Sequence, residues 1–516
     1  MNSRRASRKA EVVQKKVNSI NEGQKLHEPS ASLEKNFQIL QALFADVDTL
    51  QFKTFENLHQ KAHRFGIAFS NGLVNSAVVN DNILKPLMTL DLQSLGPITP
   101  DMLIGQLVQI GDARWSSDFS EIIESVCYGD TILFAEGIAK GMILSTKQFT
   151  TRATTEPENE RSLLGPREGF TESLLDNLSL IRRKVRTNEL KMRTLSLGKR
   201  TKTEVCVCYM NGIAAPDMID QVFQRIGRID IDAVLDSNYI MELIRDKRWA
   251  LFRSIGYTER PDVVIGKLLE GRIAIFADGS PTVLTVPYLF IENFQSNEDY
   301  YLSFYYTTYS RILRIIGFIL TIFVPGIYIA VVAFHQEMLP TPLLMNIAAD
   351  QHSVPFPAVL EAFIMLVIFD ILRETGIRMP SNIGQALSIV GALVIGQAAV
   401  AAKMVSSPMI IIVGITGITN LLVPKLNAPV VYLRFFILLG SSIFGFYGFV
   451  LATACMFIHI FNLTTLGVPQ VVLDGSLQFQ KIKDIAFRAP WWKMIKRPDR
   501  LTTNLVRNRP GDGNNG

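Results

Sequence analysis

The sequence GDTILFAEG at residues 129–137 decides the architecture of the first half of the chain, because it recurs as GRIAIFADG at residues 271–279. A second matching pair lies upstream, with IAFSNG at residues 67–72 and VCYMNG at residues 207–212, so the repeat has an offset of 140 to 142 residues. Self-similarity at a near-constant offset is the signature of a duplicated structural unit. The sequence therefore predicts two similar subdomains in tandem.

Each copy of the repeat reads as an α/β unit. A strand ends in an Asn-Gly turn, helices follow, and a β-hairpin closes the copy at Glu136-Gly137 or Asp278-Gly279, pairs that suit tight turns with positive φ. The helix before each hairpin carries an equivalent apolar stripe, made by Ile122, Ile123 and Val126 or by Val264, Ile265 and Leu268. We expect α/β subdomains at 33–150 and 165–295, joined by a polar linker at 151–164.

From residue 315 onward charged residues become scarce, and apolar runs reach the length that crosses about 30 Å of hydrocarbon. The five segments are 315–334, which Pro325-Gly326 should break, 354–372, 383–402, 404–423 and 435–461. The second is the weakest, because it opens with two prolines and contains the acidic residues Glu361 and Asp370. The expected fold class is α+β/α: duplicated α/β cytoplasmic subdomains followed by an all-α multi-span membrane bundle at 311–462.

The placement of Lys and Arg favours four full crossings and one partial crossing, made by 354–372. The soluble half ends in Arg311 and Arg314, so we expect it on the cytoplasmic side. The basic segment 463–500 then returns to the cytoplasm, where it lies on an anionic leaflet or docks on the chain's own soluble half. The polar stretches 1–32 and 501–516 are expected to be disordered.

The residues predict no catalytic site, no cofactor and no metal centre. The sequence lacks a nucleophile elbow, a dinucleotide fingerprint and a helical pair of metal-binding histidines. Cys127, Cys206, Cys208 and Cys455 form no ligand cluster, and Cys206 and Cys208 share one face of an apolar strand as small hydrophobes. The net charge of +5 is too modest to indicate a nucleic-acid partner.

A conspicuous motif follows the linker and consists of Gly165, Pro166, Arg167, Glu168 and Gly169. It opens an amphipathic helix with Phe170, Leu174, Leu178 and Ile181 on one face. A phosphate-binding loop would need Gly-Lys-Ser/Thr after a glycine-rich turn, and this motif lacks it. The spacing favours a turn and a helix start packed between the subdomains.

Several longer motifs make residues 33–500 resemble the GerA family of spore germination proteins. They are GPREGFTE at 165–172, ERPD at 259–262, HQEMLPTPLL at 335–344, PFPAVLEA at 355–362, LRETG at 372–376, PSNIGQ at 380–385, SIVGALVIGQAAV at 388–400 and RAPWWK at 488–493. The most similar type is the A subunit of a nutrient germinant receptor.

The resemblance implies a place in the inner membrane of the dormant spore. It also implies two partners, a permease-like B subunit and a C-subunit lipoprotein, and an output in which monovalent cations are released and germination begins. A paralogue group that amplifies the germination signal shares these motifs, so the resemblance leaves both roles open.

Small and polar residues line one face of the segment 384–403. Gln385, Ser388, Ala392, Gly396 and Ala399 recur at helical spacing, with bulkier residues such as Val394 opposite. Such a stripe suits close packing between membrane helices, or the lining of a pore made by several copies of the chain. The cation output implied by the family is what brings the pore into consideration.

Three function classes remain from the sequence. The favoured one is a receptor subunit that forms a homo-oligomeric, nutrient-gated cation path. A signalling scaffold without conduction is the second. A secondary transporter is less favoured, because the duplication lies in the soluble half and not in the membrane half. Glu361 either faces water, a partner or a cation path, is protonated, or stays near the interface.

Overall fold

The computed structural model describes residues 28–60, 63–90, 99–148, 160, 164–378, 391, 394–471, 487–491, 494, 497, 502 and 504. The predicted disordered termini, the linker and the basic C-terminal segment lie mostly outside these residues. The chain divides into two compact units. The first holds Met1–Arg245, Ile255–Pro287 and Ile495–Gly516, and the second holds Asp246–Ser254 and Tyr288–Met494.

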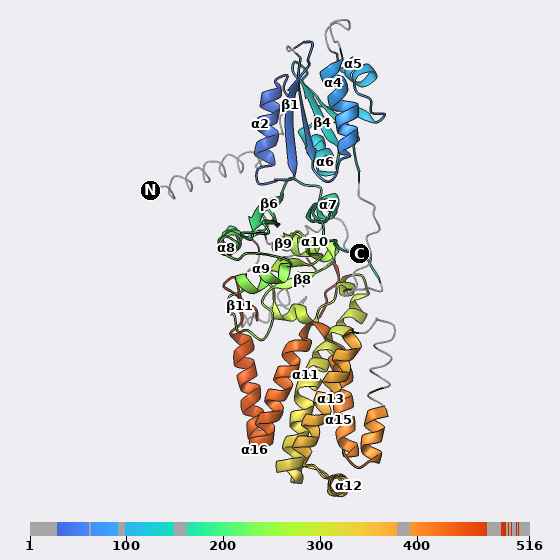
Figure 1. Cartoon of the computed structure of the whole chain (residues 1–516), viewed down its shortest axis with the longest axis vertical. Helices are drawn as coiled ribbons and strands as arrows, with labels where there is room; N and C mark the ends of the chain where they lie inside the picture. Colours follow the sequence, from blue (N-terminus) through green and yellow to red (C-terminus); the bar gives the residue numbers. More distant parts are fainter. Residues whose placement is uncertain are drawn as a thin grey trace, which may run out of the picture. The chain divides into compact units, whose positions relative to one another are not determined.

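The first unit contains two five-stranded antiparallel sheets with the same strand order (Figure 1). The first sheet, in the order β1-β2-β4-β5-β3, is built from Leu50–Glu56, Arg64–Ser70, Thr131–Ala135, Gly141–Leu144 and Ala113–Ser116. The second, in the order β6-β7-β9-β10-β8, is built from Leu190–Leu197, Thr203–Met210, Ile273–Ala277, Val283–Val286 and Gly256–Thr258. The equivalent strands are separated in sequence by the offset of the repeat.

The registers of the two sheets also correspond. In the first sheet Gly66 pairs with Phe134, and in the second Cys206 pairs with Phe276. The glycines Gly137 and Gly279 both have positive φ, 90° and 83°, but each lies in a five-residue connection between its strands and not in a two-residue hairpin turn. The duplication is therefore visible in strand order, in pairing and in turn conformation.

Two helices cover the same face of each sheet. They are α2 (Leu33–Leu43) and α6 (Phe119–Cys127) in the first copy, and α7 (Leu174–Lys184) and α10 (Pro261–Leu269) in the second. The other elements of the first copy are α3 (Ser76–Val78), η1 (Val79–Leu84), α4 (Lys85–Thr89), α5 (Pro100–Met102) and η3 (Leu103–Leu107), and those of the second are α8 (Pro216–Ile226) and α9 (Ser237–Ile244).

The helix after the 165–169 motif starts later than the sequence suggested. It begins at Leu174, because the hydroxyl of Ser173 accepts a hydrogen bond from the backbone N–H of Asp176 and caps the helix. Phe170 precedes the helix, and its ring packs edge-on against Phe276 at 5.5 Å between centroids. The four apolar residues of the predicted stripe are all buried in the core, but Phe170 lies in the segment before the helix and not in the helix itself.

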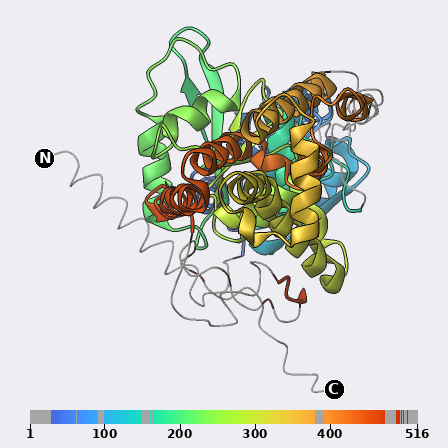
Figure 2. The ribbon, with the colours of Figure 1, turned by 90° about the horizontal axis from the view of Figure 1, so that it is seen from below.

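Helices dominate the second unit (Figure 2). They are α11 (Phe304–Phe334), α12 (Thr341–His352), α13 (Ala358–Arg378), α15 (Ser407–Asn420) and α16 (Asn427–Phe461), with short turns η4 (Phe290–Phe294), η5 (Asn297–Tyr300), η6 (Gln336–Met338) and η7 (Pro424–Leu426) and the small strands β11 (Thr464–Thr465) and β12 (Val468–Pro469). Residues 394–401 are also helical. Among the described residues, two helices are long and apolar enough to cross a membrane, Phe304–Phe334 and Pro424–Phe461.

The longest straight helix, α11, packs against α13, α15 and α16. It starts eleven residues before the predicted apolar segment and continues through Pro325, so the expected break is wrong. Neighbouring helices commonly compensate a proline in an apolar helix. Gly326 allows α16 to approach closely, since an added Cβ would lie 2.8 Å from the side chain of Ile437.

The helix α13 is continuous over 21 residues, a rise of about 32 Å, and its length alone does not limit it to the partial crossing expected from the sequence. By contrast, α15 spans 14 residues within the predicted segment 404–423. It runs antiparallel to α11, because Thr419 contacts Thr321 at 2.8 Å near the start of the bundle and Met409 packs with Ile329 farther along.

The last apolar segment reverses direction at Gly445, where φ is 60° and ψ is −136°. In a straight helix Gly440 and Gly448 would be about 12 Å apart. Here a Cβ on Gly440 would lie 2.9 Å from the carbonyl oxygen of Gly448, so the two arms of α16 pack side by side. The sequence predicted one crossing over 435–461, and the structure has a helical hairpin instead (Figure 1).

The hairpin defines two ends of the second unit. Gly445 lies beside Phe334, and these residues mark what we call the distal end. The start of α11 and the end of α16 mark the proximal end, where Ile460 and Phe318 share one apolar cluster with Phe294. Both arms of α16 therefore begin or end proximally.

Candidate functional site

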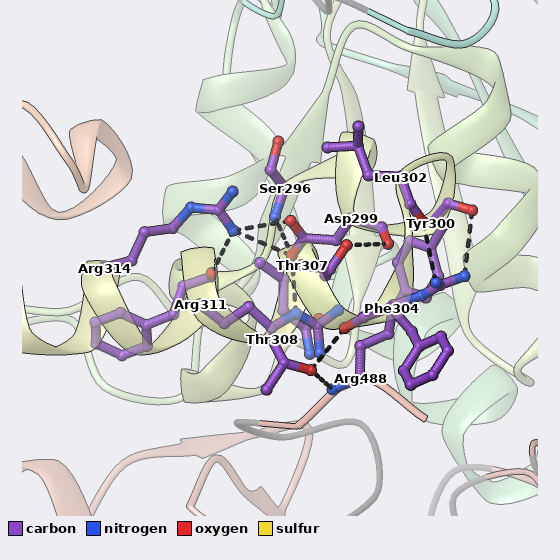
Figure 3. Close-up of polar contacts among 12 residues, drawn as sticks. Ser296, Asp299, Tyr300, Leu302, Phe304, Thr307, Thr308, Arg311, Arg314 and Arg488 are labelled. Atoms are coloured by element: carbon purple, nitrogen blue, oxygen red, sulfur yellow. Dashed lines mark hydrogen bonds and ion pairs between the residues drawn. The ribbon is translucent and has the colours of Figure 1, made fainter. Parts of the chain in front are cut away.

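A buried ion cluster holds the start of α11 (Figure 3). Asp299, only 1% exposed, accepts hydrogen bonds from Arg311 Nε at 2.8 Å and from Arg314 at 3.0 Å. Its backbone carbonyl accepts from the hydroxyl of Thr307 at 3.0 Å. Two arginines that the sequence marked as the end of the soluble half therefore share one carboxylate in the turn before the helix.

The C-terminal motif reaches the same place. Arg488 donates to the carbonyl oxygens of Leu302 and Tyr300 at 3.2 and 3.3 Å, and its backbone N–H donates to the hydroxyl of Thr308 (Figure 3). Its guanidinium also lies 5.7 Å from the ring of Trp491. At these residues the tail motif docks on the first turns of α11, within the second unit.

The acidic residue Glu361 is buried near the distal end. It is 1% exposed, and its Oε1 accepts hydrogen bonds from the backbone N–H of Ser406 and from the Ser406 hydroxyl, the latter at 2.6 Å. Its Oε2 is buried and has no hydrogen-bond partner among the described residues. Apolar side chains surround the site, including Ala362, Met365 and Val405.

Asp370 forms an ion pair on another part of α13. Its Oδ2 lies 2.5 Å from a terminal nitrogen of Arg434, whose side chain is 0% exposed, and its Oδ1 lies 3.8 Å from Arg373. The Arg434 Nε and Nη1 atoms are buried without a hydrogen-bond partner among the described residues. The pair joins α13 to the first arm of α16.

The 165–169 motif contacts two helices of the second subdomain. Glu168 binds Arg183 and Lys184 at the end of α7, the latter at 2.8 Å. Burial would raise the pKa of Glu168, but the hydrogen bonds and charges of Lys184 and Arg183 outweigh it and lower that pKa. Arg260 donates to the carbonyl oxygen of Pro166 at 2.7 Å. The motif thus ties α7 to the start of α10, with no ligand needed to explain it.

Only two members of the small-residue stripe are described. Gln385, Ser388 and Ala392 lie outside the described residues. Gly396 is buried, and an added Cβ would meet Ile410 of α15 at 3.6 Å. Ala399 packs against the apolar cluster that includes Met409 and Val413, whereas Val394 is exposed.

Sequence reasoning found the two acidic residues of α13 but missed their partners. Ser406 and Arg434 lie 45 and 64 residues farther along the chain. A charged Arg434 inside an apolar run was a signal that could have been used, since such a charge normally has a partner. No group of three or more potential metal ligands occurs within the described part of the chain.

In the second unit the ionisable groups Glu361 and Arg434 are buried among apolar helices. Buried ionisable groups in apolar helices are costly, and they usually mark pathways, switches or obligatory contacts.

The family model described as Bacillus/Clostridium GerA spore germination protein matches residues 38–500.

Two relatives in Bacillus subtilis agree with that match. The chain is 39% identical over 477 residues to the uncharacterized membrane protein YfkQ of Bacillus subtilis (strain 168), covering 91% of each chain. It is 39% identical over 461 residues to spore germination protein KA of the same organism, covering 89% of this chain and 84% of that relative. The crystal structure of the N-terminal domain of the A subunit of the Bacillus megaterium spore germinant receptor GerK3 matches at 29% identity and a TM-score of 0.42, covering 52% of this chain and 99% of that chain.

Proposed function

Because the chain belongs to the GerA family of spore germination proteins, we propose that it is the A-type subunit of a nutrient germinant receptor in the inner membrane of the spore. Its partners are then a permease-like B subunit, a lipoprotein C subunit and further copies of itself. Membership of the family supports the receptor role, and the apolar helices support the location.

The proposed topology has six crossings. They are α11, α13, the segment 383–402 expected from the sequence, α15 and the two arms of α16. A return between α13 and α15 is required because α13 ends proximally and α15 begins distally, as the contacts of Asp370 with Arg434 and of Glu361 with Ser406 indicate. An even number of crossings places the tail on the same side as the soluble half.

The distribution of basic residues supports this topology. Of the distal connections, residues 335–357 contain no Lys or Arg, and the turn before α15 contains one, Lys403. Four full crossings and one partial crossing would place Lys425 and Arg434 on the outside. When α16 is a hairpin, both residues lie at or near the proximal ends of their elements. The positive-inside rule then puts the proximal end in the cytoplasm, which is the spore core.

We further propose that several copies of the helical unit enclose a cation path. The observation that carries this proposal is a set of ionisable groups within the helices, because a passive anchor would have no use for it. Glu361 and Arg434 are buried, and Asp370 pairs with Arg434. In the ring, the stripe from Gln385 to Ala399 lines the passage. One helix cannot enclose a pore, so conduction requires the oligomer.

A second candidate is a signalling scaffold without conduction. It is favoured by the contact of Gly396 with Ile410 of α15, because part of the stripe then serves helix packing within one chain. An amplifying role in the same germination pathway fits this alternative as well.

Flux through liposomes distinguishes the two candidates. The purified chain, alone and with its partner subunits, is reconstituted and tested for nutrient-dependent release of K⁺. Enlarging the stripe by Gly396→Leu should reduce flux while the protein still accumulates, and Val394→Ala, on the exposed face, is the matched control. Failure of Gly396→Leu to accumulate would favour packing, and normal accumulation with normal flux would reject both uses of the stripe.

A further inference from the structure

The two copies of the repeat differ at one connection. In the first copy residues 108–112 join η3 to the edge strand β3, and in the second copy residues 245–255 join α9 to the equivalent edge strand β8. The shorter connection begins with Val108, which is buried in the core of its own subdomain. Residues Asp246–Ser254 of the longer one belong instead to the second unit. The extra length is not needed for the shared fold, so it requires another explanation.

The extra segment is basic and aromatic. It reads DKRWALFR from 246 to 253, with one acidic and three basic residues. Trp249 is 97% exposed, and Arg248 and Arg253 on either side of it are exposed too. A tryptophan with almost its whole surface in water is unfavourable in a soluble protein, since its burial removes a large apolar area from water.

The segment is fixed to the proximal end of α16. The backbone N–H of Leu251 donates to Nε2 of His459 at 3.3 Å, and Lys247 donates to the carbonyl oxygen of Asn462 at 2.6 Å. Phe252 is buried against the His459 ring, 6.1 Å between centroids. Two residues of chain reach at most about 7 Å, so Trp249 stays close to the last turn of α16.

The last turn of α16 indicates the depth of Trp249 in the proposed membrane. Ile458 is 67% exposed and Phe461 is 49% exposed, so the last turn of α16 still presents apolar side chains outward. In a membrane these side chains face lipid, and the helix ends directly after them. Trp249 and its flanking arginines therefore lie where hydrocarbon meets headgroups, the level at which tryptophan and basic residues are enriched.

We propose that the 246–253 segment is an interfacial anchor, with Trp249 inserted among phospholipid headgroups and Arg248 and Arg253 beside anionic phosphates. The proposal rests on the membrane insertion of the second unit proposed above. A protein partner fits less well, because one tryptophan buries about 150–250 Å² whereas a stable interface buries about 800 Å² on each side.

Tryptophan fluorescence in nanodiscs tests the anchor in the full chain. The nanodiscs contain phosphatidylglycerol and phosphatidylcholine brominated near the headgroup end of its acyl chains. Trp115→Phe, Trp491→Phe and Trp492→Phe together leave Trp249 as the single reporter. A matched variant keeps only Trp115, which lies in the first sheet. A third replaces all four tryptophans by Phe and carries Ile458→Trp to report insertion of α16.

The anchor predicts that bromolipid removes most of the emission of Trp249 and of the Ile458→Trp variant, and leaves that of Trp115 unchanged. If bromolipid quenches the Ile458→Trp variant but not Trp249, and aqueous iodide does quench Trp249, the anchor would be overturned but not the membrane insertion. Emission of Trp249 that neither quencher reaches would show that a protein covers it and would also overturn the anchor. Absence of bromolipid quenching in the Ile458→Trp variant would reject the insertion and the anchor together.

Discussion

Removing Asp370 from its ion pair with Arg434 should destabilise the helical unit more than removing Arg434. Arg434 is 0% exposed and lies 2.5 Å from Asp370, its one ion-pair partner among the described residues. Asp370 is 18% exposed and keeps a second cation, Arg373, at 3.8 Å. Removing the carboxylate therefore strands a fully buried charge, whereas removing Arg434 leaves a partly hydrated and partly paired one.

The magnitude follows from this asymmetry. Breaking a buried ion pair at one partner typically costs about 3–5 kcal/mol, because the other charge remains buried. We expect Asp370→Leu to fall near the upper end of that range and Arg434→Met near the lower end. The double variant Asp370→Leu/Arg434→Met removes both charges, and such replacements are often neutral or stabilising by about 1–4 kcal/mol.

Thermal unfolding of the purified chain in one detergent measures the order. The double variant should unfold within a few degrees of the unchanged chain, Arg434→Met earlier, and Asp370→Leu earliest. Arg373→Met is a suitable control, since its contact with Asp370 is longer and its side chain is 17% exposed. A double variant as unstable as Asp370→Leu would refute the reasoning, because it would show that packing and not stranded charge sets the cost.

Three further predictions concern the same helices. Glu361→Gln should leave the amount of protein unchanged and slow cation release from germinating spores if the buried carboxylate acts in the path, and germination at the normal rate would assign it a packing role only. Gly445→Ala should lower accumulation, because φ there is 60° and an added Cβ would lie 2.8 Å from a side-chain atom of α11, whereas Gly414→Ala, with nothing within 4 Å, should be tolerated. A cysteine in place of Gln351 should react with impermeant thiol reagents in intact cells and one in place of Lys496 should not, and labelling at Lys496 would contradict six crossings.

The repeat in the sequence predicted the sheets because its landmarks are turns. Gly137 and Gly279 adopt positive φ, and this backbone preference of glycine does not depend on what packs around the turn. The outer strands were harder to predict. β3 and β8 pair with the last strand of each hairpin from far along the chain, and no turn residue specifies that pairing.

The reversal in α16 had only a weak signal in the sequence. As a straight helix the expected segment 435–461 would rise about 40 Å, beyond about 30 Å of hydrocarbon, and this excess length fits a tilted crossing as well as a turn. No proline or charge marks the turning point. Gly445 lies between Gly440 and Gly448, and nothing local distinguishes the glycine that turns from those that let the arms approach.

The buried charges show where sequence reasoning about a site reaches its limit. Glu361 and Asp370 are nine residues apart, which places them about 180° apart around a helix, so the sequence already implied two different surroundings. It could not name those surroundings, because each partner depends on a chain reversal that the apolar pattern does not encode. Ser406 reaches Glu361 because the backbone bends before α15, and Arg434 reaches Asp370 because the first arm of α16 descends beside α13. An acidic residue in an apolar helix therefore predicts that a partner exists, and only the path of the chain determines which partner it is. For Asp370 the partner is an arginine, which pairs the charge. For Glu361 it is Ser406, and one oxygen of Glu361 has no hydrogen bond among the described residues.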